Sequence, residues 1–69
     1  MNGGWYYLPN GVMTHWRDVD ALGVLLPESV CGIEPGDPDE WRGTGSQDER
    51  DRVAFLPRCR RCDGVVSKP

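Results

Sequence analysis

Apolar residues near the start of the chain fall in two short runs, residues 5–8 and 12–16, which flank Pro9-Asn10-Gly11. Proline presets the first central position of a turn, and Asn-Gly tolerates positive φ. The pattern therefore predicts a β-hairpin over residues 5–16. In this hairpin His15 lies near the end of the second strand.

The next apolar segment, residues 21–26, is interrupted by Gly23 and followed by Pro27. This pattern favours a short helical turn or an irregular strand over a long helix. Residues 29–33 have the composition of a short strand. We therefore expect Cys31 to lie on a strand in the middle of the chain.

Residues 34–52 differ from the rest of the chain in composition. Prolines and glycines forbid regular structure in the first part, and the second part is polar without apolar periodicity, so we expect a long acidic surface loop. Trp41 is its only large apolar side chain. We expect Trp41 either to cover the small core or to anchor a binding partner, because Trp is common among hot-spot residues.

After this loop, residues 53–56 predict a strand and residues 65–66 a second short strand, with Cys59-Arg60-Arg61-Cys62 between them. Two thiolates separated by two residues can face one tetrahedral ion if the backbone turns back on itself, and Gly64 offers the freedom for that turn. Residues 53–66 therefore predict a strand followed by a zinc knuckle.

The knuckle supplies half of a zinc site, and the chain offers one further cysteine, Cys31, and one histidine, His15. Together with Cys59 and Cys62 they form a Cys3His set, which has the four ligands of a structural zinc site. Any disulfide pairing leaves one thiol over, and a thioredoxin-like redox site needs a longer chain. His15 rests on the weakest pattern, and Asp63 or a water could complete the site instead.

The size of the chain makes a metal ion useful. We treat the 69 residues as a single domain, 1–69, and a core of this size rarely supplies more than about 3–5 kcal/mol. Structural zinc contributes an apparent ~10–16 kcal/mol at neutral pH in small peptides. The expected fold is a small α+β or mostly β domain with a hairpin and a knuckle, zinc-ribbon-like and stapled by one structural Zn²⁺.

Hydropathy excludes a membrane protein at the level of the sequence. No apolar run has the length of a membrane helix, and the N-terminus lacks the basic start and apolar stretch of a signal peptide. Free cysteines without such a signal are typical of a reducing compartment. We therefore expect a cytoplasmic protein.

Charge is segregated along the chain, although the net charge is only −3. The acidic loop offers a surface for a protein partner, and the knuckle offers a basic cluster. The candidates for partner binding are Asp37, Asp39, Glu40 and Trp41. The candidates for nucleic-acid contact are Arg58, Arg60 and Arg61.

Two functions follow from this segregation. The first is a protein-protein interaction module or regulator, which the sequence pI of about 4.9 favours. The alternative is a nucleic-acid-binding zinc knuckle, in which the arginines contact phosphates. The arginines also have a simpler explanation, because they can stabilise the neighbouring thiolates.

The sequence lacks the residues of a zinc enzyme. A zinc deaminase needs a glutamate two positions after its histidine ligand and a Pro-Cys-x-x-Cys motif. His15-Trp16-Arg17 has no glutamate, and Arg58 separates Pro57 from Cys59. An ion held by four protein ligands also has no open position for a substrate water. We expect no enzymatic activity.

Three segments carry a resemblance to a known group: Thr14-His15-Trp16, Val30-Cys31-Gly32-Ile33 and Pro57-Arg58-Cys59-Arg60-Arg61-Cys62. In order and type they resemble the small Cys3His zinc-binding proteins of actinobacteria and their phages. The resemblance implies a zinc site and a phage or actinobacterial origin, with a host protein as the partner of a phage protein. The chain is also similar, more distantly, to zinc ribbons and treble clefs. It departs from them by having His15 in place of a first C-x-x-C.

Overall fold

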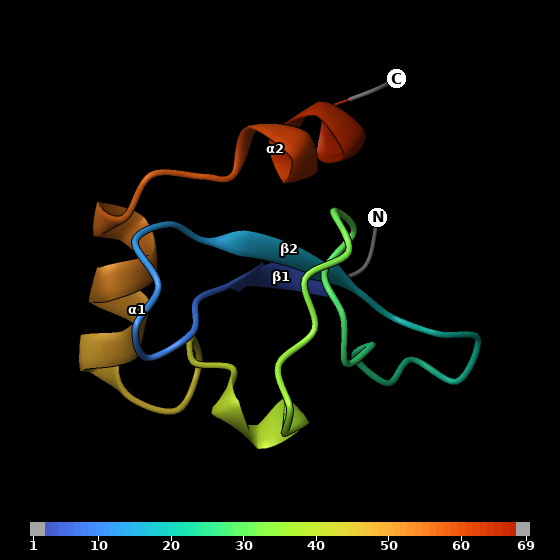
Figure 1. The fold of residues 1–69 in the computed structure, drawn as a ribbon. Helices are drawn as coiled ribbons and strands as arrows, with labels where there is room; N and C mark the ends of the chain where they lie inside the picture. Colours follow the sequence, from blue (N-terminus) through green and yellow to red (C-terminus); the bar gives the residue numbers. More distant parts are fainter. Residues whose placement is uncertain (1–2, 68–69) are drawn as a thin grey trace.

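The computed structural model describes residues 3–67. Its elements in chain order are β1 (Gly3–Tyr6), β2 (His15–Asp18), the 3₁₀ helix η1 (Pro38–Glu40), α1 (Gln47–Phe55) and α2 (Arg60–Val66). Figure 1 shows the two-stranded sheet in the middle, with α2 on one side of it, η1 on the other side and α1 at one end. The expected class, a small α+β domain with an antiparallel hairpin, is confirmed.

The N-terminal hairpin forms, but its strands are shifted along the chain. β1 ends at Tyr6 and β2 continues to Asp18, with Trp5 directly opposite Trp16. The two indoles pack edge to face with ring centroids 5.5 Å apart. Cross-strand aromatic pairs contribute roughly 0.2–1 kcal/mol, which favours a register centred on this pair. His15 consequently lies at the start of β2 and not near its end.

The connection between the strands is wider than predicted. The Gly11 amide donates to the Leu8 carbonyl at 2.8 Å, so Pro9 and Asn10 are the central residues of the turn. None of these residues has a positive φ. The Asn-Gly pair therefore does not form the tight primed turn of a two-residue hairpin, and residues 7–14 make a loop.

The edge of β2 that faces away from β1 organises the rest of the fold. Along this edge the carbonyls of Thr14, Trp16 and Asp18 each accept a backbone hydrogen bond of 2.8–2.9 Å. The donors, in the same order, are the amides of Cys59, Val30 and Leu26. Alternate carbonyls of a strand point to the same edge, so the start of α2 and the segment that holds Leu26 and Val30 dock side by side along β2.

The segment after β2 is the irregular alternative expected from its composition. Val19 and Leu25 form an isolated antiparallel bridge. The Asp20 carboxylate accepts from the amides of Leu22 and Val24, and Gly23 takes a φ of 81° at the turn. Positive φ is easily reached only by glycine, which explains the break in the apolar run.

Residues 34–52 are only partly a loop, which corrects the prediction from composition. Asp37 caps η1 through its side chain, which accepts from the Asp39 amide at 2.9 Å. Arg42 and Tyr7 then exchange two backbone hydrogen bonds of 2.9 and 2.8 Å. These bonds attach the acidic segment to the residue that follows β1.

The strand predicted for residues 53–56 is wrong, because α1 runs through residue 55. Ser46 caps the helix, because its hydroxyl accepts from the Glu49 amide at 3.3 Å, and the Glu49 carboxylate accepts from the Gly43 amide at 2.8 Å upstream of the cap. Pro57 disfavours helical backbone at the residue before it, and the helix ends just upstream. No side chain of α1 is buried.

The strand predicted for residues 65–66 is also wrong, because they complete α2. Cys59 stands at the N-cap, and its carbonyl accepts from the Asp63 amide at 2.9 Å. Gly64 lies inside the helix without a positive φ. The knuckle therefore turns by entering a helix directly, and Gly64 does not provide the turn.

The buried interior contains few apolar side chains. Within residues 3–67, the buried hydrophobic residues are Tyr7, Trp41, Cys59 and Cys62. The buried polar residues are Thr14, His15, Arg17 and Ser29. Large aliphatic side chains such as Leu22 and Val24 are exposed instead. The centre of this domain is thus built on cysteine, histidine and aromatic residues.

Candidate metal centre

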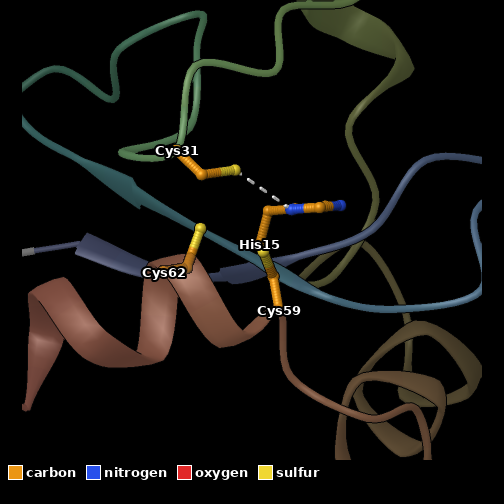
Figure 2. Close-up of side chains that lie close together, drawn as sticks. All are labelled: His15, Cys31, Cys59 and Cys62. Atoms are coloured by element: carbon orange, nitrogen blue, oxygen red, sulfur yellow. Dashed lines mark hydrogen bonds between the residues drawn. The ribbon is translucent and has the colours of Figure 1, made fainter.

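Four side chains of metal-ligand type meet at the edge of β2. The ligand atoms of His15, Cys31, Cys59 and Cys62 all lie within 4.8 Å of one another. A tetrahedral zinc with Zn–S distances of about 2.3 Å places its sulfurs about 3.8 Å apart, so small side-chain shifts would close the site. Figure 2 shows Cys31 entering from a turn and Cys62 from α2, with both sulfurs directed into the space between.

Cys59 and Cys62 reach the cluster through the start of α2. The Cys59 amide donates to the Thr14 carbonyl, and the Thr14 amide donates to the Pro57 carbonyl, both at 2.8 Å. These two bonds fix the knuckle beside the residue that precedes His15. One helical turn then brings Cys62 to the same side as Cys59, and its side chain is fully buried.

Cys31 lies on a turn, which corrects the strand predicted for residues 29–33. The Gly32 amide donates to the Ser29 carbonyl at 2.9 Å, and Gly32 has a φ of 95°. The Ile33 amide donates to the Ser29 hydroxyl at 3.1 Å, and this hydroxyl lies 3.0 Å from the Cys31 sulfur. The Val30–Trp16 backbone bond holds the turn against β2.

His15 is buried on β2 between the two docked segments. Its Nδ1 lies 3.5 Å from the Cys31 sulfur, so this nitrogen faces the cluster. Its ring packs edge to face against Trp41, with centroids 6.2 Å apart. The alternative ligand Asp63 is exposed on α2, where its carboxylate accepts from the Ser67 hydroxyl. His15 is therefore the fourth group that the fold brings to the three sulfurs.

The pKa values of Cys62, Cys31 and His15 are shifted in different directions. Burial raises the pKa of the Cys62 thiol to about 11, and the neighbouring Cys31 adds to the rise. At Cys31 burial also opposes ionisation, but hydrogen bonds from Ser29, Cys62 and the Ile33 amide outweigh it and lower the pKa. Burial lowers the pKa of His15 from 6.5 and keeps its imidazole neutral. If all three thiols ionise together, their charges need a cation to balance them.

The donor set fits zinc. Soft thiolates with one neutral imidazole are the ligands of structural zinc sites, and four protein ligands fill a tetrahedral ion completely. The four donors come from three segments, so an ion here would join the start of β2, the Cys31 turn and the start of α2. The cluster is compatible with one structural zinc ion, as predicted from the sequence.

The partner-binding candidates divide into two groups. Asp37, Asp39 and Glu40 are exposed on η1. Trp41 is 7% exposed, and its Nε1 donates to the Pro27 carbonyl at 2.8 Å. Trp41 therefore covers the core, which is the first of the two roles expected for it from the sequence.

The three candidate arginines are exposed around the start of α2. Arg58 lies with its guanidinium 4.8 Å from the centre of the Trp5 ring. Its backbone pairs with Thr14 in an isolated parallel bridge. Arg60 and Arg61 follow in the first turn of the helix. The structure thus gathers a basic edge beside the cluster.

Three buried polar residues near the cluster were not found from the sequence. Thr14 fixes the knuckle, Ser29 contacts Cys31, and Arg17 is buried on β2. Strand alternation puts Arg17 on the face of His15, which was the available signal. The predicted strand ends at residue 16, so Arg17 was not expected to lie on it.

Fold and site together define a small α+β domain built around a Cys3His cluster. Comparison with known protein families gives no match, and neither curated proteins nor solved structures give one. No helix within residues 3–67 is long and apolar enough to cross a membrane.

Proposed function

We propose that this chain is a small zinc-binding module that binds another protein. The observation that carries the proposal is the Cys3His cluster, which joins distant segments at a centre with few apolar side chains. A core this poor in apolar residues cannot offset the entropy of ordering the chain without a further source of stability. A bound ion would supply it.

A site with four protein ligands has no position for a substrate, so the ion serves the fold. The function of such a module lies on its surface. The surface of α1 is the strongest candidate, because Phe55 is 85% exposed there. Phe55 and Leu56 line a hollow of about 510 Å³ together with Asp48, Asp51 and Arg52.

Charge indicates the chemistry of the partner. Asp48 and Asp51 flank the apolar part of the hollow, and Arg52 is directed toward the Tyr7 ring, 5.9 Å from its centroid. The acids at η1, which are Asp37, Asp39 and Glu40, are also exposed. Complementary charge speeds association and fixes orientation. The fitting partner is a protein segment that combines lysine or arginine with a large apolar side chain.

A titration with synthetic peptides tests this proposal. Peptides that pair basic residues with leucine are added to ¹⁵N-labelled protein, and amide shifts are mapped. We expect the shifts on α1 and η1, with binding weakened at least about fivefold by Phe55→Ala. Leu22→Ala is the matched control, because Leu22 is 88% exposed on the loop after β2. Equal effects of the two substitutions would contradict the proposal.

Nucleic-acid binding is the second candidate, supported by the exposed arginines beside the cluster. Its test uses single- and double-stranded oligonucleotides at physiological salt. Submicromolar binding that is lost when Arg58, Arg60 and Arg61 are all changed to Gln would favour this function. Each phosphate contact that is removed should reduce the salt slope by about one.

A further inference from the structure

Arg17 is a buried cation next to the cluster. It is 7% exposed and lies two residues after His15, on the same face of β2. Its Nε donates to the Leu26 carbonyl at 2.8 Å. Its guanidinium lies 4.9 Å from the centre of the Tyr6 ring and 5.3 Å from that of Trp41. A buried charge is costly unless an opposite charge or several polar groups compensate it.

Trp41 connects this cation to the metal cluster. One part of the indole contacts the guanidinium of Arg17, and the ring also packs against the imidazole of His15. The Nε1 bond to the Pro27 carbonyl prevents the indole from rotating. The imidazole is therefore held by a ring that is itself fixed at two points.

The net charge of a zinc-bound site agrees with a buried cation at Arg17. One Zn²⁺ with three thiolates and a neutral imidazole carries a net negative charge. Arg17 is permanently protonated, and only an aromatic layer separates it from the site. Its charge offsets that of the cluster across low-dielectric surroundings.

We infer that Trp41 is a positioning residue of the metal site: held by Arg17 and Pro27, it keeps the imidazole of His15 turned so that Nδ1 remains the fourth ligand. This inference rests on the proposed zinc function. Outer groups that hydrogen-bond a ligand histidine commonly affect metal affinity by about 10–100-fold, and we expect a fixed ring packed against the imidazole to act at the low end of this range. Without Trp41, His15 leaves more readily and a water takes its place.

The first test compares Trp41→Ala with the wild type in two measurements. Transfer of zinc to a chromogenic chelator should be at least about tenfold faster in the variant. In the Co²⁺-loaded protein, the visible ligand-field bands should shift from those of the wild type as a water oxygen replaces the imidazole nitrogen. Trp5→Ala is the control, because Trp5 packs against Trp16 and Arg58 and makes no ring contact with His15. It should leave the Co²⁺ spectrum unchanged.

A double-mutant cycle separates positioning from general stabilisation. If Trp41 acts through His15, the Trp41 substitution should add no further increase in zinc transfer to a His15→Ala protein. Trp41→Phe retains an aromatic ring but loses the Pro27 bond, and it should give an intermediate rate with a foldable core. Additive effects, or a wild-type rate and Co²⁺ spectrum in Trp41→Phe, would overturn the inference. A wild type that binds no zinc would overturn the proposed function instead.

Discussion

The two helices of this domain are similar in size and polarity but are attached in different ways. α2 has seven residues and buries Cys62 completely, and the preceding Cys59 is bonded to the backbone of Thr14. α1 has nine residues and buries none of them. It is held by its Ser46 cap, by the Glu49 bond to Gly43 and by the contact of Arg52 with Tyr7.

This difference shows what a metal cluster does for a short helix. Isolated helices of this length are marginal in water, so each needs an attachment. In α2 a ligand side chain takes the place of an apolar face. In α1 the attachment is polar and peripheral, which leaves its outer surface free to bind.

Loss of one thiolate should break the attachment of α2 and the fold with it. We expect Cys62→Ser to abolish the cooperative thermal transition, because a structural zinc contributes an apparent ~10–16 kcal/mol. Circular dichroism of the variant, and of the wild type with excess chelator, measures this. Phe55→Ala, an exposed change on α1, should melt within a few degrees of the wild type. A cooperative melt of Cys62→Ser near the wild-type temperature would show that the helix is held by other contacts.

Zinc affinity should fall as the pH falls. Burial raises the pKa of the Cys62 thiol to about 11, so the thiol holds its proton through the neutral range and zinc binding must release it. The affinity should therefore rise about tenfold or more per pH unit between pH 6 and 8.

Burial lowers the pKa of His15 from 6.5, so the imidazole is already neutral at pH 7 and adds little to the slope there. Below pH 6.5 the unfolded chain takes up a proton that folded His15 resists, so acid also destabilises the folded state. Competition with a chelator at several pH values measures both effects. A pH-independent affinity would contradict the arrangement of thiols described here.

Two glycines at positive φ allow a comparison: Gly32 lies in the turn that carries Cys31, and Gly23 lies in the loop after β2. Gly32→Ala and Gly23→Ala place an alanine at φ of 95° and 81°, with no atom within 4 Å of either new Cβ. Each should cost about 1–2 kcal/mol of backbone strain. Only Gly32→Ala should also weaken zinc binding, because Gly32 shapes the Cys31 turn. Chemical denaturation and chelator competition on the pair test this, and equal zinc affinities would exclude a role of the turn in binding.

The smallest expected effect concerns α1 alone. Ser46→Ala removes the N-cap and should cost about 1 kcal/mol. Because α1 buries no side chain, we expect the loss to appear as faster amide exchange within residues 47–55, with exchange in β2 and α2 little changed. An equal loss of protection in α2 would show that both helices unfold as one unit.

The Cys3His set could be predicted because this chain has only three cysteines and one histidine. The hairpin could be predicted because the turn residues and the apolar alternation agree. The helices could not be predicted from composition. Ser46 and Glu49 have the spacing that marks the start of a helix, but the polar composition around them predicts a loop. Val65 and Val66 favour strands, yet the docking of Cys59 and Cys62 places them at the end of a helix.

The burial of Trp41 and Arg17 depends on contacts that the sequence does not encode locally. A charged residue is expected at the surface. Arg17 is buried because Tyr6, Trp41 and the Leu26 carbonyl, which come from three parts of the chain, surround it in the folded state.

X-ray absorption at the zinc edge of the purified protein, with zinc quantified against protein, tests the central claim most directly. We expect one zinc per chain with three sulfurs at about 2.3 Å and one nitrogen at about 2.0–2.1 Å. In His15→Ala the scattering from the imidazole should disappear, and the shell of three sulfurs should remain. A first shell with fewer than three sulfurs, or a folded protein without stoichiometric zinc, would contradict the account.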